Sequence, residues 1–231
     1  MKAFLLAAGF GTRLKPITDS VPKCLVPISG RPLIEFWFDL FKKYGVTEVL
    51  INTHYLVEEV ESYFTNRKND GIKITLINEK KLLGSAGTIR DNKEFVKGEE
   101  YFAVFYADNL TNLNIQNLEN FHKSHKFPVT VGVFRTETPK ACGILETDST
   151  QTVVSFEEKP QNPKSNLANG GVYIFDSKVI DSIAKGDIID VGYDLLPQFV
   201  SRMKAWEIDG ILHDIGTHEN LAKAEKLLKE F

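Results

Sequence analysis

The sequence predicts a mixed α/β fold with a doubly wound, mostly parallel sheet, and three observations support this prediction. In the first half of the 231-residue chain, short apolar runs typical of buried strands alternate with segments whose apolar residues recur at helical spacing. Glycine and polar residues separate these segments. In the second half, strand-like segments follow one another through short connections. We therefore expect a small β-rich extension of the same sheet there, not an independent domain.

Each element of the first half has its own local signal. Residues 4 to 8 form an uninterrupted apolar run, Pro32 suits the first turn of a helix, and Gly45 suits the end of that helix. Aromatic and β-branched residues fill the segment that ends at Asp108, as in a buried strand. The predicted strands are Lys2–Ala8, Glu48–Thr53, Ile72–Asn78 and Tyr101–Asp108, and the predicted helices are Pro32–Lys43, Val57–Phe64 and Thr88–Phe95.

The second half contains shorter elements with short connections between them. Its final segment is amphipathic at helical spacing. The predicted strands are Val129–Arg135, Cys142–Thr147, Thr152–Glu157, Gly171–Phe175 and Lys204–Asp209, and the predicted helices are Ser177–Ala184, Asp194–Phe199 and Glu219–Leu228.

Composition excludes several functional classes. The formal net charge of −3 gives no sign of nucleic-acid binding. The chain has two cysteines, Cys24 and Cys142, without metal-like spacing, and we expect both to be reduced thiols. We see no signal peptide, and no stretch approaches the roughly 20 apolar residues that a membrane span needs. A cytoplasmic location and no membrane partner are therefore expected.

A glycine-rich turn follows the first predicted strand, and Gly9 and Gly11 allow backbone N–H groups to approach an anion closely. Leu14 stands where a dinucleotide-binding fingerprint needs a third glycine, and the spacing of a P-loop is missing too. The remaining interpretations are a plain tight turn and a nucleotide-binding turn completed by cations. In the second case the planar guanidinium of Arg13 can donate two hydrogen bonds to phosphate oxygens, and the Lys23 ammonium can bind them as a point charge.

Two aspartates follow apolar runs in distant parts of the chain. Asp108 ends a predicted strand, and Asp214 follows apolar residues near the C-terminus. Hard cations such as Mg²⁺ take carboxylate and phosphate oxygens, so both aspartates are candidate metal ligands. The alternative for each is a local role, since aspartate commonly caps a turn or a helix.

Three further motifs have both a structural and a functional interpretation. The small residues of Gly84–Gly87 could simply begin a helix with Ser85 or Thr88 as its cap, or leave backbone amides free to read a flat base. Glu158 and Lys159, before a proline, could be a surface charge pair or polar ligands. The segment Asn169–Gly171 could be an ordinary β-turn.

These motifs together resemble the signature of the sugar-1-phosphate nucleotidylyltransferases, also called sugar-nucleotide pyrophosphorylases. The similar strings are LAAGFGTRLKPIT…PKCLVPI, KLLGSAGT, YADN, FEEKP and HDIGT, spread from the first strand to the last helix. The fifth string departs from the family pattern, because His218 stands where the family often has proline. The resemblance implies a Rossmann-like sheet with a sugar-binding extension, and a single domain over residues 1–231. Residues 1–110 would be its nucleotide-binding half and residues 111–231 its sugar-binding half.

The resemblance also implies a role for each candidate residue. Arg13, Lys23 and Lys159 would be catalytic: the first two would face the β- and γ-phosphates and the leaving pyrophosphate, and Lys159 would hold the sugar phosphate. Mg²⁺ would be the cofactor, bound by Asp108 and Asp214. The nucleotide would be bound by Leu6, Ala8, Gly9, Gly11, Thr12, Arg13, Gly84, Ser85 and Gly87, and the sugar by Asn109, Glu158, Lys159, Asn169 and Gly170.

The implied reaction converts a nucleoside triphosphate and a sugar-1-phosphate into a nucleotide sugar and pyrophosphate. The form of the Gly84 motif is closer to guanylyltransferases acting on mannose- or heptose-1-phosphate. The alternatives are a thymidylyl- or uridylyltransferase for glucose-1-phosphate, a cytidylyltransferase, and a non-catalytic sugar-nucleotide sensor. A nicotinamide dehydrogenase is disfavoured by Leu14 and by the absence of an acidic residue in Asn52–His54. A homodimer is left open. Because the sequence continues only briefly after its last predicted helix, we expect it to lack the left-handed β-helix extension that some members of the family carry.

Overall fold

The computed structural model describes residues 1–228, which divide into two compact units interleaved along the sequence. We call residues 3–82, 106–115 and 209–228 the glycine-turn unit, and residues 1–2, 83–105 and 116–208 the β-rich unit. The last three residues of the predicted sugar-binding half lie outside the described residues.

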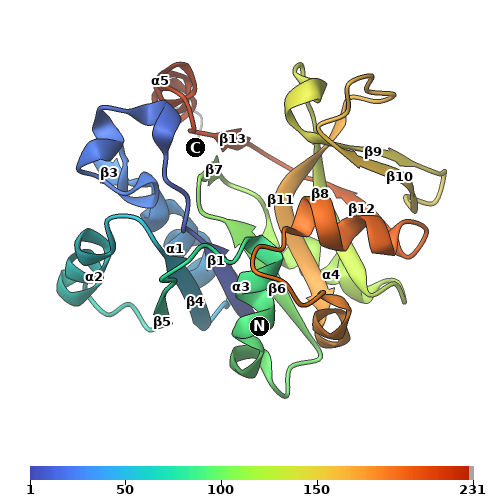
Figure 1. Ribbon diagram of the computed structural model, residues 1–231, viewed down its shortest axis with the longest axis horizontal. Helices are drawn as coiled ribbons and strands as arrows, with labels where there is room; N and C mark the ends of the chain where they lie inside the picture. The colour runs from blue at the N-terminus through green and yellow to red at the C-terminus, as the bar shows by residue number, and fades with distance from the viewer. Residues whose placement is uncertain (229–231) are drawn as a thin grey trace. The chain divides into compact units, whose positions relative to one another are not determined.

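The glycine-turn unit contains a strand–helix alternation close to the predicted one (Figure 1). Its strands β1, β4 and β5 are neighbours in that order, and β4 runs parallel to β5. Short antiparallel pairs, β2 with β3 and β7 with β13, complete the unit. The elements are β1 (Lys2–Leu6), β2 (Pro27–Ile28), β3 (Arg31–Pro32), α1 (Leu33–Tyr44), β4 (Glu48–Thr53), α2 (Val57–Asn66), β5 (Lys73–Asn78), β7 (Asn109–Thr111), β13 (Leu212–Asp214) and α5 (His218–Leu227).

Helix α1 illustrates why these residues form these elements. Its apolar side chains recur at helical spacing, and Trp37 and Phe41 are fully buried with ring centroids 5.9 Å apart. Gly45 ends the helix in the left-handed conformation, at φ 73°, and donates its N–H to the Phe41 carbonyl, as predicted. Pro32 precedes the helix as its N-cap instead of lying in its first turn.

The β-rich unit contains a mostly antiparallel sheet in which β10, β9, β11 and β6 are neighbours in that order. Strand β8 pairs with β11, and β12 runs parallel to β8. The elements are α3 (Ser85–Asp91), β6 (Tyr101–Tyr106), α4 (Ile115–Lys123), β8 (Val129–Arg135), β9 (Gly143–Thr147), β10 (Val153–Glu158), β11 (Leu167–Asp176) and β12 (Met203–Glu207). Together the two units confirm the predicted mixed α/β class.

Several elements differ from the sequence-based expectations. Helix α4 and the short strands β2, β3, β7 and β13 were not predicted. The predicted helix at Ser177–Ala184 is a 3₁₀ turn, and the one at Asp194–Phe199 is a π turn followed by a 3₁₀ turn that together begin at Val191. Two- and three-residue strands carry too few residues for a periodic pattern, so pairing with a distant partner determines them.

Two neighbouring histidines in the β-rich unit are partly or fully buried. His122 is 4% exposed, and its ring nitrogens lie 2.8 Å from the Thr130 hydroxyl and 3.1 Å from an Asp176 carboxylate oxygen. His125 lies 3.0 Å from the same hydroxyl. Burial lowers the pKa of both, that of His125 to about 4, although Asp176 opposes the shift in each.

We expect the protein to lose stability as the pH falls from about 6.5 towards 4. In this window the unfolded chain binds protons on these histidines and the folded chain does not, so protonation favours unfolding. Thermal unfolding at pH 7.5, 6 and 5 measures this, and His125→Gln should flatten the dependence. The exposed His218→Gln is the control and should keep the wild-type slope. Equal slopes in all three proteins would contradict the prediction.

Candidate functional site

The glycine turn of the glycine-turn unit is folded tightly against a neighbouring residue. Gly11 has φ +64°, and a Cβ there would lie 2.8 Å from the Thr18 methyl group. The Thr18 hydroxyl donates to the Gly11 carbonyl at 2.8 Å, and the Leu14 N–H donates to the same oxygen at 2.9 Å. The turn therefore requires glycine at position 11. Gly9, Thr12 and Arg13 remain exposed, as a ligand-binding turn requires.

The strand that leads into this turn is held by a buried polar relay that sequence reasoning missed. Asn52, at the end of β4, accepts a hydrogen bond from the Ala7 N–H at 2.9 Å and donates to Glu79 at 2.8 Å. Asn52 and Glu79 are 3% and 4% exposed, so both belong to the interior. A dinucleotide-binding fold would have an acidic residue near the end of this strand. Here Asn52 is found instead, and its side-chain amide fixes the backbone at Ala7, just before the glycine turn.

Lys23 joins the two predicted metal ligands. Its ammonium nitrogen lies 2.7 Å from Oδ2 of Asp108 and 3.6 Å from Oδ2 of Asp214, and the lysine side chain is 10% exposed. The two aspartates are 106 positions apart in the sequence, and the pairing of β7 with β13 brings them together: Asp214 is opposite Asn109. The Ile215 N–H also donates to the Asp108 carbonyl at 3.0 Å.

Gly216 leaves room for the positive charges beside Asp214. A Cβ at this glycine would lie 2.8 Å from Nη2 of Arg13 and 3.0 Å from Nζ of Lys23. Its N–H donates to Oδ1 of Asp214, which holds the carboxylate in place. Arg13, Lys23, Asp108 and Asp214 therefore lie in one cluster, which we call the carboxylate–cation cluster.

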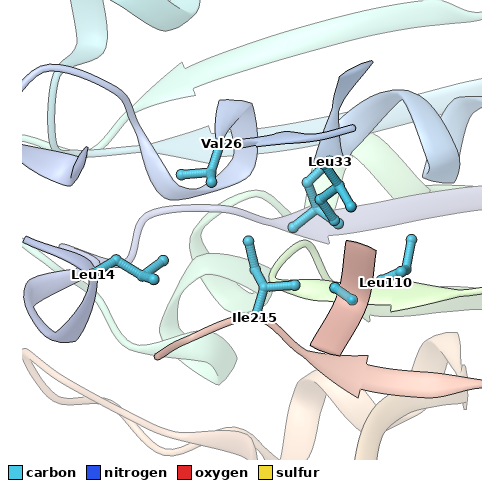
Figure 2. Close-up of a cluster of buried hydrophobic side chains, with 7 residues drawn as sticks. Leu14, Val26, Leu33, Leu110 and Ile215 are labelled. Atoms are coloured by element: carbon cyan, nitrogen blue, oxygen red, sulfur yellow. The ribbon is translucent and has the colours of Figure 1, made fainter. Parts of the chain in front are cut away.

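A hydrophobic cluster anchors the segments that carry these charges. Leu14 follows Arg13, Val26 lies three residues after Lys23, Leu110 two after Asp108, and Ile215 directly after Asp214. These four side chains are fully buried and pack together with Leu33 (Figure 2). Each functional segment thus places an apolar residue in the same core, so the packing of that core fixes where the charged side chains emerge.

The carboxylate–cation cluster is chemically suited to a Mg²⁺ ion that is shared with a phosphate ligand. Mg²⁺ is commonly bound through one or two carboxylates, with substrate phosphates and water as the remaining ligands. Asp108 and Asp214 reach one cation, the Lys23 ammonium, so their oxygens converge. Within residues 1–228 no group of three or more His, Cys, Asp or Glu side chains is arranged to hold a metal by itself.

Asn109, predicted to bind the sugar, lies beside this cluster in β7. Its side chain is 7% exposed and donates to the Tyr106 carbonyl at 3.4 Å. Among the other predicted nucleotide ligands, Leu6 is half-buried in β1 and Ala8 is buried just before the turn. The ligand roles of these three residues stay predictions.

In the β-rich unit, Glu158 ends strand β10 in a space made by two glycines. A Cβ at Gly143 or Gly192 would lie 2.4 or 2.6 Å from Oε2 of Glu158. Burial raises the pKa of this carboxyl and Asp190 adds to the rise, while Lys159 opposes it. In the described chain its carboxylate makes no hydrogen bond, so its oxygens can accept from a ligand hydroxyl.

Lys159 follows in the left-handed conformation, at φ 49°, and its N–H donates to the Cys142 carbonyl at 3.0 Å. Such a conformation is strained for lysine and is a common feature of functional sites. Its ammonium lies 5.9 Å from the centre of the Tyr193 ring, and Tyr193 is 55% exposed. Sequence reasoning missed Tyr193, since nothing in its local pattern distinguishes it from any surface aromatic residue.

The Asn169–Gly171 segment is a bulge inside β11, not the β-turn considered from sequence. The register of β11 against β8 shifts between Asn169 and Val172, and the Gly171 N–H donates to the Asn169 side chain at 3.1 Å. Gly171 takes φ +67° there. A bulge next to a functional site re-aims side chains, which is compatible with the predicted role of Asn169 and Gly170.

The Gly84–Gly87 segment begins helix α3, and its amides are not all free. The N–H groups of Ala86 and Gly87 donate to the Ile189 carbonyl at 2.9 and 3.0 Å. The expectation of free amides is therefore wrong for these two residues. The nucleotide-binding role of Gly84, Ser85 and Gly87 itself stays a prediction, now with Ile189 as a structural partner that the sequence did not reveal.

Comparisons with known proteins agree in one family. A family model described as "Nucleotidyl transferase" matches residues 2–230. The chain is 34% identical to a UTP–glucose-1-phosphate uridylyltransferase of Synechocystis sp., over 87% of this chain and 55% of that protein. It is also 34% identical to a mannose-1-phosphate guanyltransferase beta-A of Xenopus laevis, over 94% of this chain and 61% of that protein. The chain thus spans little more than half the length of these relatives.

The fold is also found among solved structures. A putative glucose-1-phosphate thymidylyltransferase from Bacillus anthracis, solved in complex with a sucrose, matches with a TM-score of 0.88 and 27% identity. The match covers 100% of this chain and 96% of that one. Among the described helices, none has the length and apolar character needed to cross a membrane.

Proposed function

The chain belongs to the nucleotidyl transferase family, and from this premise we propose that it transfers a nucleotidyl group from a nucleoside triphosphate to a sugar-1-phosphate. The products are a nucleotide sugar and pyrophosphate. The observation that carries the proposal is the convergence of Asp108 and Asp214 on the Lys23 ammonium, at 2.7 and 3.6 Å.

The reaction needs little acid–base chemistry from the protein. An oxygen of the sugar phosphate, already an anion, attacks the α-phosphorus, the bond from that phosphorus to the pyrophosphate oxygen breaks, and pyrophosphate leaves. The obstacle is repulsion between two anions, so positioning and charge compensation provide the catalysis. A bound Mg²⁺, held by Asp108 and Asp214, would supply Lewis-acid stabilisation of phosphate charge.

The protein's own cations have separate tasks in this proposal. Arg13 follows the glycine turn and, as a planar fork, suits phosphate oxygens of the triphosphate. Lys23, held between carboxylates, compensates charge on the departing pyrophosphate. Lys159, held by its backbone bond to Cys142, neutralises the sugar phosphate. The Glu158 carboxylate, which makes no hydrogen bond in the described chain, accepts hydroxyl groups of the sugar.

For the base and the sugar we propose a guanylyltransferase acting on mannose- or heptose-1-phosphate. The form of the Gly84 motif supports this, and so does the similarity to the guanyltransferase of Xenopus laevis. The similarity to the uridylyltransferase of Synechocystis sp. favours a second candidate, uridylyl transfer to glucose-1-phosphate, and the Bacillus anthracis structure adds thymidylyl transfer to the same sugar phosphate.

A single plate assay tests the proposal. Four nucleoside triphosphates are combined with mannose-, glucose- and heptose-1-phosphate, with Mg²⁺, and pyrophosphate release is measured. We expect release that requires both substrates, with the highest kcat/KM for GTP with mannose- or heptose-1-phosphate. Highest turnover with UTP or dTTP and glucose-1-phosphate would establish the second candidate. If no well releases pyrophosphate but a separate calorimetric titration shows that the protein binds a nucleotide sugar, the result would instead indicate a non-catalytic sugar-nucleotide sensor.

A further inference from the structure

Two segments of the β-rich unit that are about 100 residues apart in sequence are joined by backbone hydrogen bonds. The Ile189 N–H donates to the Leu83 carbonyl at 2.8 Å, and the Ile189 carbonyl accepts from Ala86 and Gly87 at 2.9 and 3.0 Å. Gly84 lies so close to this segment that a Cβ would be 2.4 Å from the Ile189 carbonyl oxygen. The helix entry and residue 189 therefore behave as one packed piece.

A side-chain contact reinforces this junction. The Ser85 hydroxyl donates to Oδ2 of Asp190 at 2.7 Å and accepts from the Val191 N–H at 2.7 Å. The other oxygen of Asp190 accepts from the N–H groups of Gly192 and Tyr193 at 2.7 and 3.2 Å. The Asp190 carboxylate thus bonds the helix entry through one oxygen and the turn at residues 191–193 through the other. We call the Ser85–Asp190 contact the latch.

The turn after Asp190 reaches the predicted sugar ligands. A Cβ at Gly192 would lie 2.6 Å from Oε2 of Glu158, so this backbone is packed against that carboxylate. The Tyr193 ring centre is 5.9 Å from the Lys159 ammonium. A displacement of residues 190–193 would therefore change the surroundings of Glu158 and Lys159 directly.

We propose that Asp190 is a positioning residue that couples nucleotide binding at Gly84–Gly87 to sugar-phosphate binding at Glu158 and Lys159. The inference rests on the proposed function, because it takes both segments as ligand-binding. A ligand that fixes the helix entry fixes residues 189–193 through the latch, and so preorganises the surroundings of Glu158. The linkage is reciprocal, since each ligand must change the affinity for the other by the same factor.

Two substitutions separate the latch from other roles of its residues. Ser85→Ala removes the hydroxyl and leaves Asp190 bonded to Gly192 and Tyr193. Asp190→Asn keeps an oxygen for those two amides, since asparagine caps a helix as well as aspartate, but places an NH2 donor where Ser85 needs an acceptor, so the Ser85 hydroxyl can no longer donate to residue 190. Ser85→Thr restores a hydroxyl and should keep the wild-type coupling factor. Ser177→Ala is the matched control, because its half-buried hydroxyl donates to the Glu99 carbonyl at 2.6 Å, elsewhere in the unit.

Calorimetric titration measures the coupling with unreactive probes. The pairs are α,β-methylene GTP with mannose-1-phosphate and α,β-methylene UTP with glucose-1-phosphate, each ligand titrated with and without the other. For one pair we expect the wild type, Ser85→Thr and Ser177→Ala to bind each ligand at least about fivefold tighter when the other is present. In Ser85→Ala and Asp190→Asn this factor should fall below about two, with thermal midpoints near that of the wild type.

The double variant should lose no more coupling than either single variant, because both remove the same contact. Coupling factors that stay at the wild-type value in Asp190→Asn, or losses that multiply in the double variant, would overturn the latch. If Ser85→Ala fails to fold, Asp190→Asn and Ser85→Thr decide the same question. If the wild type releases pyrophosphate and the variants keep the wild-type coupling factor, the latch is overturned and the proposed function stands. A wild type that binds no probe overturns the proposed function as well.

Discussion

Replacing Asp108 with asparagine is expected to lower kcat/KM for pyrophosphate release by about 10²–10³-fold while the protein stays folded, because a lost charge in a preorganised site typically costs this much. Asparagine keeps the shape of the side chain but removes the negative charge that lies 2.7 Å from Lys23. The same loss is expected for Lys23→Ala, which leaves Asp108 and Asp214 without their shared cation.

The matched control is Asp39→Asn in the same unit. Asp39 also bonds a cation, Arg31, at 2.6 Å, but it is largely exposed and belongs to no predicted site. We expect the Asp39→Asn variant to release pyrophosphate at the wild-type rate. Initial rates over a range of substrate concentrations give kcat and kcat/KM, and thermal unfolding of the same variants separates lost chemistry from lost structure. Turnover at the wild-type rate in both Asp108→Asn and Lys23→Ala would contradict the assigned roles.

Gly84→Ala is expected to lower the free energy of unfolding by at least about 2 kcal/mol, because it combines two costs. Gly84 has φ 77° and ψ 162°, a conformation that essentially only glycine adopts. A Cβ would also lie 2.4 Å from the backbone oxygen of Ile189, which cannot move away as a flexible side chain would. In a chain of this size the loss corresponds to a thermal midpoint at least about 4 °C lower.

Gly45→Ala is the matched control for this prediction. Gly45 also has a positive φ, 73°, but apart from its immediate surroundings in the chain no heavy atom of the described residues lies within 4 Å of a Cβ built there. The variant should therefore show the cost of backbone strain alone, about 1–2 kcal/mol. Chemical denaturation of the three proteins provides the comparison. If Gly84→Ala is no less stable than Gly45→Ala, the close packing of Gly84 on Ile189 has no energetic consequence.

Sequence reasoning predicted best where a segment carries its own pattern. Strands β4 and β8 have the predicted bounds, and α1 ends at Gly45 as expected, because a short buried run rich in apolar and β-branched residues and a glycine cap are local signals. Asp108 could be chosen from the sequence since it follows a strongly apolar run. The same reasoning missed β7 and β13, and with them the reason why Asp214 meets Asp108: that pairing joins segments about 100 residues apart.

The β-rich unit shows the same limit at its candidate site. The string at Gly84–Gly87 predicts a ligand-binding turn, yet two of its amides already bind Ile189. Nothing near Asp190 in the sequence points to Ser85, because the contact depends on tertiary packing across 105 positions. Gly216 could not be predicted from sequence either. A side chain at this position would meet Arg13 and Lys23, and no local pattern encodes their approach.

The central claim is that Asp108 and Asp214 hold a divalent ion for nucleotidyl transfer, and a metal titration of pyrophosphate release tests it most directly. The protein is stripped with EDTA, and release is followed as Mg²⁺ is added to the wild type and to Asp214→Asn. We predict no release in EDTA, full recovery with Mg²⁺ in the wild type, and a half-saturating Mg²⁺ concentration at least about tenfold higher in the variant. The loss of even an outer-shell partner commonly lowers metal affinity by about tenfold or more, and Asp214 is proposed as a direct ligand. Release that continues unchanged in EDTA, or an identical Mg²⁺ requirement in the two proteins, would contradict the claim.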